Sequence, residues 1–158
     1  MTAGQYMYDH GDTGRMIPLV LMHTLGHDFV PDPIHAGGLR YHGMAPTLSL
    51  MANEGVIQAK AYNQIETFEA AKLFTMTEGI VPAPEPAHAV KATIDEALRC
   101  KETGEEKTLL FLLCGHGHFD MKAYDDYLAG NLKPYVMPRE RIDQSVDRVK
   151  AMYPGLND

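Results

Sequence analysis

An uninterrupted apolar run at residues 109–113, Leu-Leu-Phe-Leu-Leu, constrains the fold of this chain more than any other feature. Because the run lacks polar alternation, we expect Thr108–Cys114 to form a strand that is buried on both faces, as in a parallel sheet. Burial of each large side chain is expected to contribute about 1.5–3 kcal/mol. The run ends in Cys114, followed by Gly-His-Gly-His. Ligands of open α/β sheets bind beyond the carboxyl ends of strands, so this end is a candidate site.

Periodic segments on either side of this run predict the rest of the architecture. Residues 56–62 alternate like a strand. Helices are expected over residues 47–55, from the capping residue Asn63 to Gly79, from Pro86 onward, and in the segments 119–130 and 140–153. The order strand, helix, helix, strand, helix indicates an α/β fold with a mostly parallel sheet flanked by helices.

The 158 residues fit a single domain with three regions. Residues 1–46 are predicted to be a long irregular segment, because Gly, Pro and His are frequent there, with at most a short helix at residues 17–24. Residues 47–129 are predicted to form the α/β core, and residues 130–158 a C-terminal helical tail.

Charge and hydropathy exclude several classes of protein. A net charge of −7 without a cluster of Lys and Arg argues against a nucleic-acid partner. No apolar run approaches the ~20 residues that cross a membrane, and the N-terminus lacks the layout of a secretory signal. The two cysteines suit a reducing compartment. We therefore expect a soluble cytoplasmic protein.

The residues of the Cys-Gly-His-Gly-His segment are compatible with three kinds of site. His116 and His118 could face one way on an extended chain and bind a metal, but no spacing identifies a third ligand. Cys114 could be a nucleophile if a base activated it, although thiols at the end of apolar runs are usually inert. The third interpretation is structural, with Cys114 in the core and the glycines turning the chain. The residues of this segment alone favour the structural interpretation.

Four longer motifs, taken together, carry a family resemblance. They are "GDTG" (Gly11–Gly14), "HTLGHDFVPDPIHAGGLRYHGMAP" (His23–Pro46), "EGIVPAPEPAHA" (Glu78–Ala89) and "LCGHGHFDMKAYDDYL" (Leu113–Leu128). In this order and spacing they resemble the C-terminal part of tryptophan synthase beta chains, and most closely the tryptophan synthase beta-like pyridoxal-phosphate enzymes. The resemblance covers nearly the whole chain up to Leu128 and implies a fold-type II enzyme.

The resemblance implies specific contacts with pyridoxal phosphate. Cys114 matches the Ser, Thr or Cys that receives the pyridine nitrogen of the cofactor. Gly115 lets the backbone pass close to the ring, and His116 stands where ordinary beta chains carry Arg. Glu85 matches an acidic residue near the cofactor ring and is the first catalytic candidate. As an alternative, a carboxylate at this position could simply cap the following helix.

Three further candidates belong to the His23–Pro46 motif. Asp28 matches the acidic residue of a loop that rearranges over the substrate in the family, so it is the second catalytic candidate. Arg40 and His42 are polar residues in a compact loop and could reach a substrate carboxylate or a neighbouring subunit. No metal ligand is expected among these residues.

The implied activity is the joining of L-serine to indole, with release of water, to form L-tryptophan. Two parts of the family pattern do not occur in this sequence: the lysine that binds the cofactor covalently, in a His-Lys-x-Asn context, and the Gly-Gly-Gly-Ser phosphate loop. We therefore expect the chain to supply one wall of a site, and to associate with itself or with a complementary N-terminal chain. The alternatives are an inactive fragment acting as a binding module and, more remotely, a metal hydrolase using His116 and His118.

Overall fold

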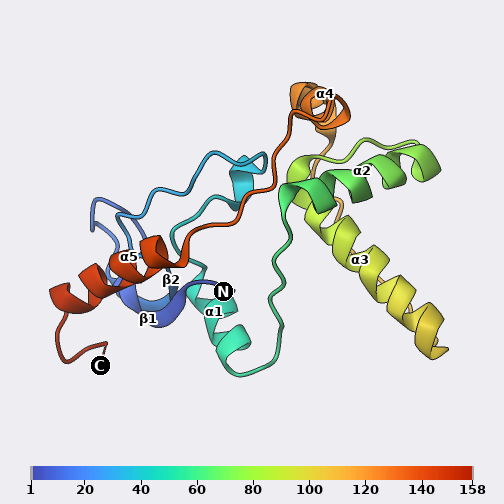
Figure 1. The fold of residues 1–158 in the computed structure, drawn as a ribbon. Helices are drawn as coiled ribbons and strands as arrows, with labels where there is room; N and C mark the ends of the chain where they lie inside the picture. Colours follow the sequence, from blue (N-terminus) through green and yellow to red (C-terminus); the bar gives the residue numbers. More distant parts are fainter. Residues whose placement is uncertain (1, 158) are drawn as a thin grey trace. The chain divides into compact units, whose positions relative to one another are not determined.

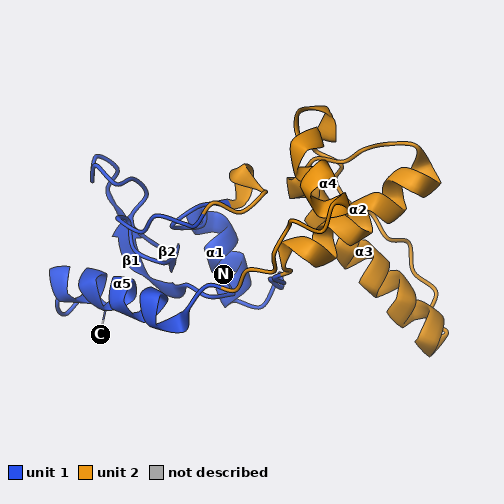
Figure 2. Ribbon diagram, turned by 45° about the horizontal axis from the view of Figure 1, so that its top comes forward, with its two compact units in different colours: residues 1–32, 40–61, 137–158 blue, residues 33–39, 62–136 orange. Residues whose placement is uncertain are grey.

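The computed structural model describes residues 2–157, which divide into two compact units (Figure 2). Of the described residues, unit 1 contains 2–32, 40–61 and 137–157, and unit 2 contains 33–39 and 62–136. The chain is a mixed α/β structure, with five α-helices and one small sheet in the part described. None of the helices within residues 2–157 is long and apolar enough to span a membrane.

Unit 1 is built on a two-stranded antiparallel sheet of β1 (Gln5–His10) and β2 (Leu19–Thr24), in which Met7 lies opposite Met22. The prediction that residues 1–46 are irregular, with a possible helix at residues 17–24, is therefore wrong. The frequent Gly, Pro and His residues lie mainly in the connections, whereas the strands are rich in Tyr, Leu, Val and Met. These residue types favour a pleated, half-buried surface.

Two helices complete unit 1. Helix α5 (Arg139–Met152) confirms the helix predicted near the C-terminus and lies beside the sheet in Figure 1. Its apolar face packs on β1 in a core formed by Met7, Ile142, Val146 and Val149. Helix α1 (Pro46–Asn53), also predicted, contacts β2, and Ser49 Oγ accepts a hydrogen bond from His23 N–H at 3.0 Å.

Unit 2 is mainly helical and contains η1 (Gly37–Leu39), α2 (Gln64–Glu78), α3 (Pro84–Thr103), η2 (Gly117–Phe119) and α4 (Met121–Leu128). Helices α2 and α3 pack against each other. The predicted limits of α2 are confirmed, because Asn63 and Glu66 form a capping box and Gly79 caps the other end at φ 70°. Helix α3 begins at Pro84 instead of Pro86, which places Glu85 in its first turn.

An aromatic cluster forms the core of unit 2. Phe68 is buried and contacts Tyr124 edge to face, with ring centroids 5.0 Å apart, and stacks on Tyr127 at 5.7 Å. Two small side chains, Ala71 and Ala87, let α2 and α3 approach closely around this ring. The fold of this unit therefore depends on one large side chain enclosed by small and aromatic neighbours.

The predicted strand at Thr108–Cys114 is not a strand in this structure. The segment is extended but makes no backbone-to-backbone hydrogen bond within residues 2–157, and Leu110 and Leu112 are 92% and 76% exposed. Residues 56–62 are likewise not a strand. A strand requires a neighbouring strand to pair with its N–H and C=O groups, and the segment has none in the described part of the chain. The mostly parallel sheet of the predicted fold class is not shown.

A network of ion pairs holds the start of this extended segment, 108–114, against α3. Glu96 accepts hydrogen bonds from Arg99 at 2.7 Å and Lys107 at 3.0 Å, and Glu105 pairs with the same two cations. The hydrogen bond from Arg99, followed by that from Lys107, lowers the pKa of Glu96 to about 2. The network therefore fixes the position at which the chain passes from the end of α3 into the apolar segment.

Candidate functional site

Two sequence motifs that are distant in the chain meet in unit 2. Ala83 N–H donates to Gly115 C=O at 3.0 Å, and Gly117 N–H donates to Val81 C=O at 2.8 Å. These bonds form an antiparallel bridge between Pro82 and His116. The bridge places the start of α3 beside the Gly-His-Gly-His segment, so the two predicted cofactor-binding motifs share one location.

The glycines of this segment are required by close packing. A Cβ atom at Gly117 would lie 2.5 Å from Pro82 O and 2.8 Å from Val81 Cγ1. These distances are too short for a carbon atom, and one of the neighbours is backbone that cannot move aside. Tyr124 adds a further constraint, because its hydroxyl donates to the same Pro82 carbonyl at 2.6 Å. The backbone of this turn is thus held closely on both sides.

Glu85 is oriented by η1. Gly38 N–H donates to Glu85 Oε1 at 2.7 Å, and a Cβ atom at Gly38 would lie 3.1 Å from the same oxygen. A carboxylate in the first turn of α3 is also favoured by the helix dipole. His88, one turn along α3, donates from Nδ1 to Pro84 C=O at 2.8 Å, a bond within its own helix.

Asp120, which sequence reasoning missed, completes this group of polar residues. Burial raises the pKa of its carboxyl, and the negative charge of Glu85 raises it further, while His116 and His35 act in the opposite direction. The sequence did offer one reason to single out Asp120, since an Asp directly before a predicted helix is a common capping residue. Asp120 does not cap α4 with its side chain in this structure, so its carboxyl remains available to the site.

We expect Glu85→Gln to lower the pKa of Asp120 but to leave it above the ordinary value, because burial is the larger cause. Carbon-detected NMR titration of the side-chain carboxyl measures this value. Glu78→Gln, at the far end of α2, is the matched control and is expected to change nothing. A full return to the ordinary pKa in Glu85→Gln would contradict the order of causes. The Asp120 carboxyl ionises at a lower pH in the unfolded chain than in the folded chain. The folded state therefore loses stability as the pH rises from the pKa of Asp120 in the unfolded chain to its pKa in the folded chain.

Cys114 and the two histidines lie at the exposed side of the turn. The prediction that Cys114 ends a buried strand is wrong, because its thiol is free and exposed. His116 caps η2, with Nδ1 accepting from His118 N–H at 3.3 Å, and the two rings are 4.7 Å apart. Residues 2–157 contain no group of three or more His, Cys, Asp or Glu side chains arranged to hold a metal ion.

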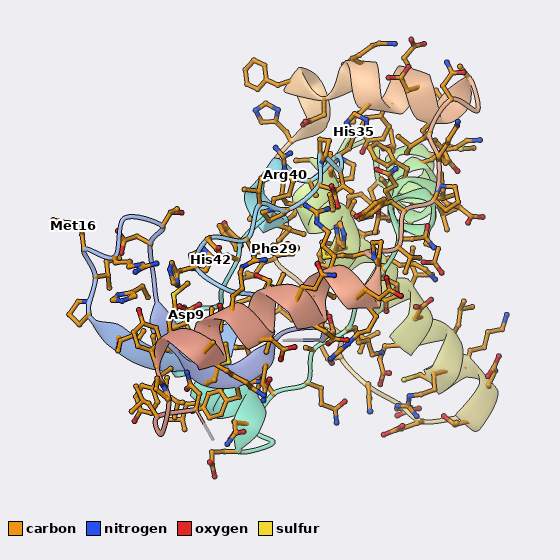
Figure 3. All side chains as sticks on the ribbon, turned by 60° about the vertical axis from the view of Figure 1, so that its left-hand side comes forward. Asp9, Met16, Phe29, His35, Arg40 and His42 are labelled. Carbon is orange, nitrogen blue, oxygen red and sulfur yellow. The ribbon has the colours of Figure 1, made fainter. Side chains whose placement is uncertain are left out.

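The remaining candidates, Asp28, Arg40 and His42, belong to unit 1. Asp28 is exposed and pairs with Arg148 of α5 at 3.3 Å. His42 donates from Nε2 to His10 C=O at 3.1 Å, so this ring supports the sheet. Arg40 is exposed and is labelled with His42 in Figure 3. The structure thus gathers Glu85, Gly115 and His116 around one bridge, whereas the other three residues lie on a separate unit.

Comparison with known proteins gives a consistent set of relatives. No family model matches the chain. The chain is 65% identical over 132 residues to tryptophan synthase beta chain 2 of Aquifex aeolicus, 60% over 135 residues to the beta chain of Thermococcus onnurineus, and 59% over 132 residues to beta chain 2 of Methanosarcina acetivorans. These matches cover 84–85% of the chain and 30% of each relative.

The Pro82–His116 bridge joins two of the four motifs, Glu78–Ala89 and Leu113–Leu128. Identity at this level over such a length establishes homology, and the chain spans about 30% of the length of the relatives it matches. The chain is homologous to tryptophan synthase beta chains over 84–85% of its own length, and it corresponds to a C-terminal segment of them.

Proposed function

We propose that this chain forms one wall of the active site of a tryptophan synthase beta-type enzyme, a pyridoxal-phosphate-dependent lyase that joins L-serine to indole. The observation that carries the proposal is the identity of 57–65% to tryptophan synthase beta chains. The bridge between Pro82 and His116 supports it, because it brings the two motifs implied to contact the cofactor to one place. Both cysteines are free thiols, which suits the proposed cytoplasmic location.

The residues around the bridge fit one edge of a pyridine ring. The exposed thiol of Cys114 is a neutral, weak hydrogen-bond partner for the ring nitrogen. Gly115 is half-buried and has no side chain, so its backbone could lie close to the ring, whereas Gly117 is packed against Pro82 and Val81. When bound, pyridoxal phosphate supplies the electron sink for replacement at the β-carbon of serine. Cys114 would hold the nitrogen without giving it a proton.

Glu85 and Asp120 have distinct proposed roles beside the ring. Glu85 is held by the hydrogen bond from Gly38 N–H, and its carboxyl can accept a further hydrogen bond from a polar group of the bound molecules. Asp120, whose pKa is raised by burial and by the charge of Glu85, keeps a proton to a higher pH than an ordinary aspartate does. In unit 1 we propose that Asp28 exchanges its ion pair with Arg148 for contacts of a closed loop, and that Arg40 binds a substrate carboxylate or a neighbouring subunit.

The exposed apolar segment supports a proposal about partners. An open groove of about 600 Å³ lies between α3 and residues 108–112, and large apolar side chains line it. Monomers rarely expose contiguous apolar patches larger than a few hundred Å². We propose that strands from the remaining length of a beta chain cover this surface, supplied by a complementary N-terminal chain, with self-association as the other outcome.

A chimeric enzyme tests the proposed function directly. In the Aquifex aeolicus relative, the homologous segment is replaced by this chain, and tryptophan formation from L-serine and indole is measured. We expect the chimera to be active and the 158-residue chain alone to be inactive. Borohydride reduction followed by peptide mapping is expected to place pyridoxal phosphate on a lysine of the Aquifex aeolicus part. Stoichiometric labelling of a lysine in this chain, with turnover of serine, would show that the chain is a complete enzyme.

In the same chimera we expect Cys114→Ser to keep or increase activity, because a hydroxyl is a stronger hydrogen-bond partner than a thiol. Cys114→Phe is expected to weaken pyridoxal-phosphate binding by about tenfold or more, since the ring would meet a bulky group instead of a hydrogen-bond partner. Fluorescence titration of the cofactor and kcat measure the two effects. Cys100→Ser, on α3, is the matched control and should change neither. Unchanged binding in Cys114→Phe contradicts the proposed contact.

The second candidate function is that of a non-catalytic binding module. The observation that favours it is the same exposed segment, 108–114, which presents unpaired backbone groups to a partner. An inactive chimera, together with binding of this chain to the separately produced remaining part of the Aquifex aeolicus chain in analytical ultracentrifugation, would support this function over the enzyme.

A further inference from the structure

A buried polar group in unit 1 lies outside the proposed cofactor site. The Asp9 side chain is completely buried and His27 is almost so, with 1% of its side chain exposed. Asp9 Oδ1 lies 2.6 Å from His27 Nδ1, and Asp9 Oδ2 accepts from the Thr24 hydroxyl at 2.7 Å. Two charged or titratable groups so far from water require strong mutual partners.

The contacts of His27 determine where its proton lies. Arg15 donates from Nε to His27 Nε2 at 3.0 Å, and a guanidinium has no acceptor atom. Nε2 must therefore be unprotonated, so Nδ1 carries the hydrogen and donates it to Asp9. These two contacts favour the Nδ1–H tautomer of His27, between the Asp9 carboxyl on one side and the Arg15 guanidinium on the other.

Arg15 belongs to the loop that connects β1 and β2, and its backbone is strained. It is the single non-glycine residue with positive φ in the described chain, at 56°. Its side chain is exposed, and Met16, beside it, lies at the outer end of the loop in Figure 3. Asp12 orders the same loop by accepting from Met16 N–H at 3.0 Å and Ile17 N–H at 2.8 Å.

We propose that His27 and Arg15 form a proton-operated latch on this loop. A proton taken from solvent by His27 Nε2 converts that atom from an acceptor to a donor, and it then faces a donor of equal charge on Arg15. The hydrogen bond breaks, Arg15 keeps its own proton and moves into solvent, and the strained backbone at residue 15 relaxes. The pair of His27 with Asp9 persists and strengthens, because both partners are then charged.

Several other titratable groups lie in the same part of unit 1. They are His10, whose ring is perpendicular at 5.5 Å and bonded to Ile17 and Tyr153; His42, which donates to His10; Asp28 and Arg148, which pair with each other; and Asp12. The hydrogen bond from Ile17, followed by that from Met16, lowers the pKa of Asp12. Asp12 therefore stays ionised near neutral pH, and its own titration does not release the loop. None of these groups occupies His27 Nε2.

Hydrogen exchange tests the latch in the full chain, independently of any catalytic activity. The amides of residues 15–17 report on the loop, because all three are hydrogen-bonded to Asp12. After correction for intrinsic rates, we expect their protection to fall by about tenfold between about pH 7.5 and about pH 5.5. Long-range proton–nitrogen NMR spectra of His27 should show the Nδ1–H tautomer at the higher pH.

Two variants make the test decisive. Arg15→Ala is expected to show low protection of the loop at both pH values, because the latch is absent. Arg139→Ala, which removes another exposed arginine from the same unit, should behave like the native chain. Protection that stays constant across this range, a fall that persists in Arg15→Ala, or an Nε2–H tautomer at the higher pH would each overturn the proposal.

Discussion

Phe68→Ala is expected to lower the free energy of unfolding of unit 2 by about 3–5 kcal/mol, because it removes a buried aromatic ring and leaves a cavity. The side chain is 1% exposed and contacts two tyrosines, so little of the space can be refilled without moving α2 or α4. Hydrogen exchange measured against urea concentration, and read in peptides from α2, gives the change for this unit separately from the other.

Phe119→Ala is the matched control for this variant. The Phe119 side chain is 93% exposed, so its removal should change stability by less than about 0.5 kcal/mol. A loss of less than about 1 kcal/mol in Phe68→Ala would show that the aromatic cluster is not the core of unit 2.

Asp9→Ala is expected to destabilise unit 1 by about 2–6 kcal/mol, because each buried donor that loses its acceptor costs about 1–3 kcal/mol. Three donors would lose their acceptor: the buried His27 ring, the buried Thr24 hydroxyl and the partly buried His10 N–H. Peptides from α5 report on this unit in the same exchange experiment, since this helix packs on β1. Peptides from α2 should be unaffected.

The control for Asp9 is an exposed pair. Asp143→Ala breaks the contact of Asp143 with Arg139 on the surface of α5, where both side chains are at least half exposed. Such pairs contribute at most about 1 kcal/mol. Equal effects of the two aspartate variants would contradict the conclusion that burial makes the Asp9–His27 contact important.

Local signals in the sequence were sufficient for the helices. Asn63 and Glu66 specify the start of α2 through atoms three residues apart, and Gly79 ends it because it adopts a left-handed conformation without steric cost. Propensity and capping depend on near neighbours only, so they can be read without knowing the fold. The limits of α2 were correct for this reason.

Elements that depend on distant partners could not be predicted in the same way. The apolar character of residues 109–113 indicated a strand, but strand formation depends on a second strand, which the described chain does not place beside it. Conversely, β1 and β2 are strands because they pair with each other. The frequent glycine and histidine residues of this region had predicted an irregular segment, because the pairing partner could not be seen in the sequence. In the candidate site, the motifs identified Glu85 and Gly115, whereas Asp120 became visible only when burial and the Glu85 charge were known.

The extended segment 108–114 has a consequence for the chain when it is produced by itself. Six successive residues from Leu109 to Cys114 have no charge and no proline, which is the composition of segments that stack into cross-β fibrils. Glu105, Glu106 and Lys107 precede this run as gatekeeper charges, separated from Leu109 by Thr108 alone. The ion pairs with α3 hold two of these charges beside the segment, so the network that positions the segment also opposes fibril growth.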